Sequence, residues 1–485
     1  MKRFHFRSII HIMGLLLVIN SIFMLTALPF SFYFEDDQHW AILMAVLITA
    51  CSGGLAFFLT LGRERIVKKR DVYIIVTFGW VLMALSATLP YLLSGSIHSL
   101  TDAFFECVSG YTTTGASILS DIEAVPPSIL YWRSLTQWLG GMGIIVLTVA
   151  ILPLIGVGGM QLFVAEAPGI SADKLRPRIT DTAKRLWLIY IGLTATEMVL
   201  LRVFGMTWYD ALNHSLTTMA TGGFSTKNAS IAHYPSPWIQ YTIVLFMFFA
   251  GTNFSMMYFG FQGKLKKVWA NDEFRAYFLS IVILSIVSGL YVGVNVYDDL
   301  ELGMRDVTFQ LVSLITTTGF VSADYTSWAP SLTIMCFILL FVGGSAGSTA
   351  GGIKTVRHLI LAKNGWLDLK RQLHPAAVIP VRLNGKAVSG EISYTVLAFV
   401  IIFLFIFVVG AMLLAMTGLD LLTAMGASAT SLGNVGPGIG KVGPVDNFAW
   451  LPPAAKWICS VLMLLGRLEL FTVLLLFTPF FWRGN

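Results

Sequence analysis

Apolar segments recur along the whole chain and are separated by short polar stretches. A helix of about 20 apolar residues crosses the roughly 30 Å hydrocarbon core of a bilayer. We therefore predict membrane-spanning helices, and the first is retained because it is too long for a signal peptide and lacks a small-residue cleavage pattern. Clear examples of these apolar runs are 9–29, 41–61, 72–93, 186–204, 278–294 and 394–416.

The composition agrees with a membrane protein and argues against a protein that binds nucleic acid. Of the 485 residues, 56% are hydrophobic and 12% are charged, a ratio typical of polytopic membrane proteins. The net charge of +6 comes from basic residues that cluster at the ends of apolar runs. Placing these clusters in the cytoplasm satisfies the positive-inside tendency and predicts cytoplasmic N- and C-termini. They hold 25 of the 32 Lys and Arg residues: Lys2, Arg3 and Arg7, the segments 63–70, 174–185, 264–275 and 354–386, and Arg483.

The basic clusters divide the chain into five units, four of which share one plan. The first unit contains two apolar helices. Each of the others contains an apolar helix, a short amphipathic segment, a glycine-bearing stretch, a polar loop and a second apolar helix. The expected fold is an all-α polytopic membrane protein with about ten membrane-spanning helices and four re-entrant pore helices around one pore. The predicted units are 1–70 (the N-terminal unit), 71–173, 174–264 and 265–385 (repeats 1 to 3, the third with a basic linker), and 386–485 (repeat 4).

Three sequence markers recur in the same order in the four repeats. The glycine stretches are TTTGAS at 112–117, ATGGFS at 220–225, TTTGFV at 316–321 and GNVGPG at 433–438, and their aligned glycines are 108, 96 and 117 residues apart. An aspartate precedes this glycine by 13 residues in three repeats (Asp102, Asp210 and Asp306) and by 16 in the fourth (Asp420). Prolines, which suit the first turn of a helix, precede the second helix at Pro126–Pro127, Pro237, Pro330 and Pro452–Pro453.

The repeated stretch has the properties of a re-entrant pore segment. We expect the aspartate to cap a helix of about twelve residues, which at about 1.5 Å per residue spans only half a membrane. Extended backbone at that depth is tolerated only where it is buried or lines a watery cavity. Four such stretches around an axis would present rings of carbonyl oxygens to a cation, and glycine permits the φ angles that turn successive carbonyls to one side. Four ordinary surface turns are the alternative, which the matched offsets of the markers disfavour.

At these residues the whole chain resembles the TrkH/TrkG subunits of bacterial potassium uptake systems, in the Trk/Ktr/HKT superfamily. The resemblance implies a selectivity filter with one glycine per repeat. In having glycine in all four repeats, this chain resembles the potassium-selective members of the superfamily. The fourth stretch lacks the Thr-Gly pair of the other three. The implied potassium-binding residues are Thr112, Thr113, Thr114 and Gly115; Ala220, Thr221, Gly222 and Gly223; Thr316, Thr317, Thr318 and Gly319; and Gly433, Asn434, Val435 and Gly436.

The same resemblance implies a location and partners. It implies a potassium-conducting pore in the bacterial inner membrane, passive or weakly coupled, in a homodimer with one pore per chain. A cytosolic nucleotide-binding regulatory protein of the TrkA type would gate the pore. No cofactor is expected in this chain besides the transported potassium ion. The alternative is a symporter that couples potassium to protons or sodium, which would need titratable groups along the pore, whereas the predicted filter offers only hydroxyls and carbonyls.

A segment of small residues, GGSAGSTAGGIKT at 343–355, interrupts the second helix of repeat 3. So many glycines disfavour a regular helix, and the segment departs from a nucleotide-binding P-loop because Ile353 stands before Lys354 and Thr355. The family resemblance implies an intramembrane gating loop below the filter, with Arg467 as a positive charge beside it. Pairing of Arg467 with Glu469, or snorkelling to the interface, is the alternative. The implied gate residues are Gly343, Gly344, Ser345, Ala346, Gly347, Ser348, Thr349, Ala350, Gly351, Gly352 and Arg467.

The remaining polar features support narrower predictions. Glu197 lies in an apolar run, and we expect it to pair with Arg202 or a neighbouring helix rather than to conduct ions. The basic segment 359–390 is expected to lie on the inner membrane surface, in contact with lipid, or to dock a partner. The eight histidines show no metal-ligand spacing and the four cysteines no paired spacing, so the sequence predicts neither an enzyme centre nor a disulfide or zinc framework.

Overall fold

The computed structural model describes residues 4–61, 68–146 and 179–483. Helices make up nearly all the regular structure in these ranges, as predicted for an all-α membrane protein. A small hairpin is the exception there, in which β1 (Arg382–Leu383) pairs antiparallel with β2 (Lys386–Ala387). The predicted boundary at 173/174, and the parts of the basic clusters at 1–3, 63–67 and 174–178, lie outside the described residues.

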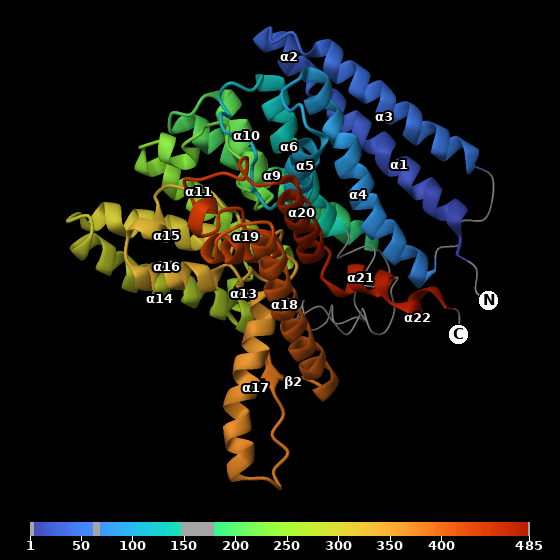
Figure 1. Cartoon of the computed structure of the whole chain (residues 1–485). Helices are drawn as coiled ribbons and strands as arrows, with labels where there is room; N and C mark the ends of the chain where they lie inside the picture. Colours follow the sequence, from blue (N-terminus) through green and yellow to red (C-terminus); the bar gives the residue numbers. More distant parts are fainter. Residues whose placement is uncertain (1–3, 62–67, 147–178, 484–485) are drawn as a thin grey trace.

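The N-terminal unit is a pair of long helices that lie side by side at one edge of the molecule (Figure 1). A Cβ added at Gly14 in α1 (Phe6–Leu25) would lie 2.7 Å from the carbonyl oxygen of Gly53 in α3 (His39–Leu59). Glycines at this crossing therefore allow the two backbones to touch, as small residues do between membrane helices. The unit has one short helix more than predicted, α2 (Leu28–Phe34), which nearly continues α1.

The four repeats follow the predicted plan of a long helix, a short helix, an extended stretch and a second helix. Repeat 1 contains α4 (Lys69–Ser94), α5 (Leu100–Tyr111) and α6 (Pro127–Val146), and repeat 2 contains α9 (Ile179–Val203), α10 (Trp208–Met219), α11 (Pro237–Ala250) and α12 (Phe254–Phe261). Repeat 3 contains α13 (Leu265–Trp269), α14 (Asp272–Asn295), α15 (Leu300–Ile315) and α16 (Pro330–Leu339). Repeat 4 contains α18 (Gly390–Met416), α19 (Leu421–Gly433), α20 (Pro453–Arg467), α21 (Phe471–Leu474) and α22 (Pro479–Trp482).

Shorter elements connect these helices. Repeats 3 and 4 are joined by α17 (Thr355–Leu373), which extends beyond the rest of the helices with the β1–β2 hairpin beside it (Figure 1). Single 3₁₀ turns lie in the loops that follow the glycine stretches and near the C-terminus: η3 (Ser230–His233), η4 (Tyr325–Ser327), η5 (Gly440–Val442) and η6 (Leu475–Phe477).

Six helices in the described part of the chain are long and apolar enough to span a membrane, and the number rises to eight if two bent pairs each count as one span. The bent pairs are α11 with α12 and α20 with the α21–η6 segment, and each bends by 109°. In repeats 1 and 3 the same position is taken by α6 and by α16, which has only ten residues. Neither α6 nor α16 is among these candidate spans, so the predicted number of about ten membrane-spanning helices stays a prediction.

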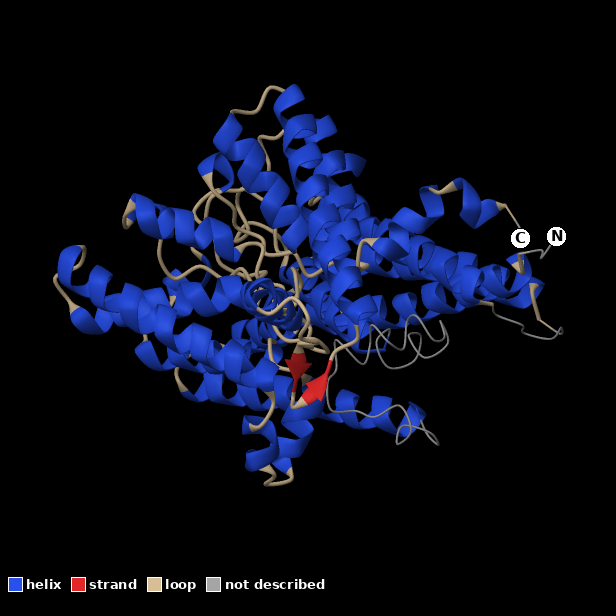
Figure 2. Ribbon diagram, turned by 90° about the horizontal axis from the view of Figure 1, so that it is seen from below, coloured by secondary structure: helices blue, strands red, loops and turns tan. Residues whose placement is uncertain are grey.

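The second helices begin at proline and pass close to the ends of the short helices. Each of them starts at the predicted proline, whose missing N–H costs nothing in a first turn. A Cβ at Gly140 in α6 would overlap the carbonyl of Tyr111, and a Cβ at Gly466 in α20 would overlap that of Leu432. This close approach draws the loop segments together, and Figure 2 shows them gathered at the centre of the molecule with helices around them.

The prediction that the marker aspartate caps its short helix is wrong in three repeats. Ser99 and Thr207 are the N-cap residues of α5 and α10, and the marker aspartates lie three residues further on, in the first turn. The third short helix begins earlier, because Asp299 accepts a hydrogen bond from the amide of Leu302 and caps it. Only the fourth marker is itself a cap: Asp420 accepts from the amide of Thr423 at 3.1 Å.

Candidate functional site

The four short helices α5, α10, α15 and α19 end in the same backbone motif. In each, the residue two before the aligned glycine is left-handed, with φ of 50° at Thr113, 54° at Thr221, 55° at Thr317 and 54° at Asn434. The amide of the next residue donates to the carbonyl five residues earlier, at 2.9, 2.9, 2.8 and 3.1 Å in repeats 1 to 4. This pattern is a Schellman helix end. Its left-handed position is usually glycine, so threonine there is strained, as residues at functional sites often are.

The aligned glycines are left-handed as well. Their φ angles are 84° at Gly115, 73° at Gly223, 79° at Gly319 and 104° at Gly436. We define the glycine stretches as 112–115, 220–223, 316–319 and 433–436. In each stretch the second and the fourth residues thus have positive φ. Glycine is required at the fourth position because other side chains resist positive φ.

The four glycine stretches close into one ring, although they come from parts of the chain more than 300 residues apart. A Cβ at Gly115 would overlap the carbonyl oxygen of Gly222, and a Cβ at Gly436 would lie 2.7 Å from that of Thr114. A Cβ at Gly223 would overlap the carbonyl oxygen of Thr318, and a Cβ at Gly319 would overlap that of Val435. Each glycine therefore abuts the carbonyl before the next repeat's glycine, in the order 1, 2, 3, 4 and back to 1.

Hydroxyl groups flank this ring in alternate repeats. The Oγ1 atoms of Thr112 and Thr114 lie 2.8 Å apart, and so do those of Thr316 and Thr318. Repeats 2 and 4 carry Ala220 and Gly222, and Gly433 and Val435, at the same positions. In repeat 4 the side-chain Nδ2 of Asn434 donates to Thr114 Oγ1 at 3.0 Å and to the Met463 carbonyl at 2.9 Å, so this stretch is linked by a hydrogen bond to repeat 1.

All four aligned glycines line one open cavity of about 100 Å³. Ser117, Ser225, Lys227 and Asp446 belong to the same lining. The cavity lies on the side of the ring from which the polar loops return, so an ion could reach the carbonyl oxygens from there.

On the other side of the ring lies the segment 343–352, here named the central loop. The Gly351 amide donates to Thr317 Oγ1 at 2.6 Å, and Thr349 Oγ1 donates to the Met219 carbonyl at 3.0 Å. The Ser345 amide donates to the Gly251 carbonyl at 2.8 Å. These bonds place the loop directly against the ends of the second and third short helices.

Arg467 is buried against the central loop. Its Nη1 donates to the Thr349 carbonyl at 2.7 Å and its Nη2 to the Gly140 carbonyl at 3.3 Å. Glu469 pairs instead with Arg357, at 2.6 Å. The alternatives of a direct Arg467–Glu469 pair or of snorkelling to the interface are therefore not what the structure has, since the side chain is 2% exposed.

The central loop does not form a phosphate-binding cradle. Its amides at Gly343, Ser345 and Gly351 donate to groups of the protein itself. The Lys354 ammonium group donates to the carbonyl of Ala350, and Val342 and Ile353 form an isolated parallel bridge across the base of the loop. Because these donors are already hydrogen-bonded within the protein, the segment does not offer the free amides with which a P-loop binds phosphate.

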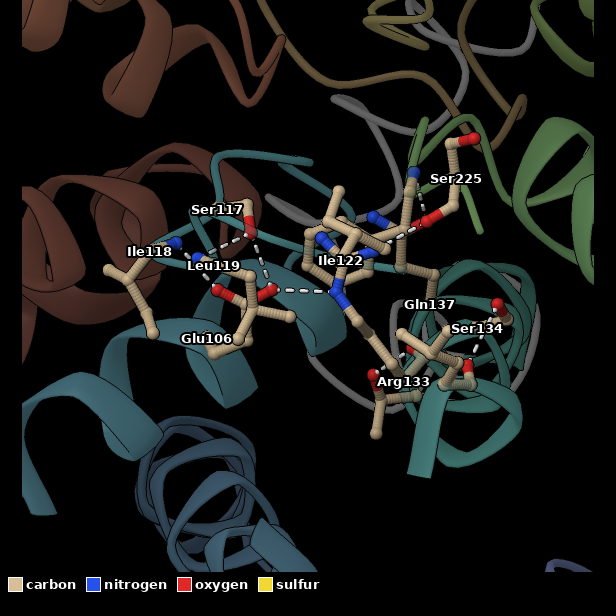
Figure 3. Close-up of polar contacts among 12 residues, drawn as sticks. Glu106, Ser117, Ile118, Leu119, Ile122, Arg133, Ser134, Gln137 and Ser225 are labelled. Atoms are coloured by element: carbon tan, nitrogen blue, oxygen red, sulfur yellow. Dashed lines mark hydrogen bonds and ion pairs between the residues drawn. The ribbon is translucent and has the colours of Figure 1, made fainter. Parts of the chain in front are cut away.

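A buried ion pair behind the ring was not predicted from the sequence. The Glu106 carboxylate lies between Ser117 and Ile118 on one side and Arg133 on the other (Figure 3). Glu106 is fully buried and Arg133 is 2% exposed. The available signal was one charged residue in each of the apolar stretches FFECV and LYWRSL, a placement that is costly unless the charges are paired.

The sequence predicted that Glu197 pairs with Arg202 or with a neighbouring helix, and Arg202 is not its partner. Neither of its carboxylate oxygens has a hydrogen bond to a described residue, and the side chain is fully buried on α9. Arg202 donates to the Met206 carbonyl at 3.1 Å and lies over the Trp208 ring. In the basic segment 359–390, Lys363 pairs with Asp272 at 2.7 Å, and contact with lipid or with a partner stays a prediction.

The comparison with known families decides the class of the protein. The family model TrkH, described as a cation transport protein, matches residues 38–483. The chain belongs to the TrkH family of cation transport proteins. This confirms the prediction that it is not an enzyme.

Individual relatives match along the whole length. The Trk system potassium uptake protein TrkH of Salmonella typhimurium is 40% identical over 99% of this chain and 100% of that protein. TrkG of Escherichia coli K12 is 33% identical over 100% of both chains. The crystal structure of the potassium transporter TrkH from Vibrio parahaemolyticus has a TM-score of 0.90 at 37% identity and covers 99% of this chain and 100% of that one. The likeness confirms the predicted helical membrane fold.

Proposed function

We propose that this protein takes up potassium through a selectivity filter formed by backbone carbonyl oxygens of the four glycine stretches. The ring in which each aligned glycine abuts the carbonyl of the next repeat carries the proposal. Carbonyl oxygens arranged around an axis can replace the hydration shell of a cation. Potassium is the proposed ion because the relatives from Salmonella and Vibrio are named as potassium uptake and potassium transport proteins.

The central loop serves as the gate in this proposal, and the described conformation is closed. Its bonds to Thr317 and Met219 fill the space below the ring. Arg467 acts on it in two ways: it holds the loop through the Thr349 carbonyl, and its buried positive charge opposes a resting cation there. Opening requires the loop to leave these partners, and the freed guanidinium group then needs a new acceptor.

The setting of the pore follows the predictions from the sequence. We place the protein in the bacterial inner membrane with both termini in the cytoplasm, as a homodimer with one pore per chain. A cytosolic nucleotide-binding protein of the TrkA type would move the central loop. Coupling to protons or sodium has less support, because the sixteen residues of the four glycine stretches carry no titratable side chain.

The test is uptake of radioactive rubidium into liposomes that contain the purified protein, with potassium or sodium as competitor. In Gly115→Ser the new side chain would enter the space of the Gly222 carbonyl, and we expect the preference for rubidium over sodium to fall by at least about tenfold. Gly95→Ser is the matched control, because Gly95 has a similar φ of 71° but no atom within 4 Å of an added Cβ.

Two outcomes would contradict the proposal. One is a Gly115→Ser protein that keeps the wild-type preference, as Gly95→Ser is expected to do. The other is a wild-type protein without flux both alone and after addition of the TrkA-type partner. Flux that appears only with the partner would support a gate that rests closed.

A further inference from the structure

We propose that Glu106 and Arg133 are positioning residues that determine ion selectivity, because they clamp the glycine stretches of repeats 1 and 2 together from behind. This inference rests on the proposed function, since it assigns the control of selectivity to a pair that contacts no ion. Arg133 Nε lies 2.7 Å from Glu106 Oε1, and both residues are buried.

Glu106 holds the backbone that leaves the ring in repeat 1. Ser117 Oγ donates to its Oε1 at 3.0 Å and the Ile118 amide donates to its Oε2 at 2.9 Å. These residues follow Gly115 by two and three positions. Both carboxylate oxygens thus accept hydrogen bonds, and they join the short helix α5 to the segment that follows the glycine stretch of repeat 1 (Figure 3).

Arg133 carries the clamp across to repeat 2. Its Nη1 donates to the Ser225 carbonyl at 3.0 Å, and its guanidinium carbon lies 3.6 Å from the centre of the Phe224 ring. Lysine could not reproduce this set of contacts, because only the planar guanidinium group donates in two directions and stacks on a ring at once.

Gln137 extends the same contact surface by one helical turn. Its Nε2 donates to the Gly222 carbonyl at 2.6 Å, and its Oε1 accepts from the Phe224 amide at 3.0 Å. Residues four apart lie on one face of a helix, so α6 presents Arg133 and Gln137 together to repeat 2. The three residues 222, 224 and 225, which surround Gly223, are therefore all fixed by side chains of repeat 1.

The charge balance of the pair matters as much as its geometry. Arg133 lines the open cavity that the four aligned glycines share. With Glu106 ionised beside it, the pair is neutral toward a cation in that cavity. If either charge is removed alone, the other stays uncompensated at a buried position, where electrostatic effects are strong.

Among the residues that the structure describes, the other repeats do not have an equivalent ion pair. Nine residues before the aligned glycine, where repeat 1 has Glu106, repeat 2 has His214 and repeat 3 has Gln310. His214 Nε2 lies 2.9 Å from Ser225 Oγ. The side chain of Gln310 has no hydrogen bond to any residue in the described ranges, and Val321 stands where Ser117 and Ser225 offer a hydroxyl. The clamp is thus a property of repeats 1 and 2.

The experiment compares rubidium and sodium uptake in liposomes for Glu106→Gln, Arg133→Lys and Ser117→Ala. We expect the preference for rubidium to fall by about tenfold in the first two and by about twofold in Ser117→Ala, which removes the hydrogen bonds of Ser117 Oγ with Glu106 and with the Leu119 amide without leaving a bare charge. The matched control is Glu301→Gln, in a pair with Arg305 (3.4 Å) at the far end of α15. Monodispersity in detergent reports folding for each variant.

Gly115→Ser in the same assay separates the two proposals. If it loses the preference while Glu106→Gln and Ser117→Ala keep it, the clamp is wrong and the proposed filter stands. If Gly115→Ser keeps the preference, the proposed function itself is wrong. A loss of total flux with an unchanged preference in folded variants would also overturn the clamp, because it would indicate a structural role alone.

Discussion

Repeats 1 and 3 build the same backbone around the ring but support it differently. Thr113 and Thr317 have φ angles of 50° and 55°, and a pair of threonine hydroxyls lies 2.8 Å apart in both repeats. Behind repeat 1, both oxygens of Glu106 are hydrogen-bonded, whereas Gln310 behind repeat 3 has no such bond to a described residue. Below the ring it is repeat 3 that is hydrogen-bonded and repeat 1 that is not. Thr317 Oγ1 accepts from the central loop, whereas Thr113 Oγ1 has no partner in the described part of the chain.

The comparison shows that backbone shape and side-chain support are separable. The shape comes from the helix end, whose hydrogen bonds are made by backbone atoms in all four repeats and so tolerate different side chains. The support comes from side chains and can be placed where it is needed. Repeat 1 is hydrogen-bonded from behind, which suits the selection of ions that we propose, and repeat 3 is linked to the central loop, which suits a response to the proposed gate.

We expect the largest effect when the stability of a variant that lacks Glu106 is compared with that of a variant that lacks Gln310. Glu106→Leu leaves the Arg133 charge buried without its partner, which should destabilise the protein by about 3–5 kcal/mol. Gln310→Leu removes two buried polar atoms without a described partner and should be neutral or stabilising. Thermal unfolding of the two purified variants in detergent measures this difference. Equal losses would mean that Gln310 supports repeat 3 as strongly as Glu106 supports repeat 1.

A smaller effect is expected where the ring meets the central loop. Thr317→Val removes the acceptor of the Gly351 amide and should weaken the closed loop by about 1–3 kcal/mol, because that amide is left unsatisfied. The protein should then conduct more without its partner, and rubidium uptake under a fixed gradient measures this. Thr113→Val is the matched control in repeat 1, and a similar rise in both variants would contradict a special link between repeat 3 and the gate.

The smallest expected effect comes from adding a brace to repeat 3. Val321→Ser supplies a hydroxyl at the position where Ser117 and Ser225 meet Glu106 and His214. A new hydrogen bond to Gln310 should stabilise the protein by about 1 kcal/mol relative to Val321→Ala, which has the same loss of apolar volume without the hydroxyl. Denaturation curves of the two variants measure the difference. If the serine variant is no more stable than the alanine variant, Gln310 does not reach this position.

The parts of the fold that depend on local rules could be predicted from the sequence. The four second helices begin at the expected prolines, and the aligned glycines all have positive φ, because both residue types act through their own backbone geometry. The alignment of the four repeats, from which the candidate site was derived, rests on the same markers. The predicted roles of the glycine stretches, the central loop and Arg467 stay predictions, which the uptake experiments address.

The parts that depend on competition or on distant contacts could not be predicted. The marker aspartates were expected to cap their helices, but Ser99 and Thr207 begin α5 and α10 one turn earlier. Glu106 and Arg133 were missed because their contacts join residues 27 and 92 positions apart. Arg467 was placed beside the gate, but its acceptors, the carbonyls of Thr349 and Gly140, come from segments that only the folded chain brings together.

The ring also has a genetic consequence, because all four of its glycine stretches belong to one chain. In a pore assembled from identical subunits, one codon change alters every position of a layer at once. Here a change at Gly115 alters one quarter of the ring and leaves Gly223, Gly319 and Gly436 as they are. Each quarter can therefore diverge on its own under selection, and the unlike supports behind repeats 1 and 3 are what such independent divergence would produce.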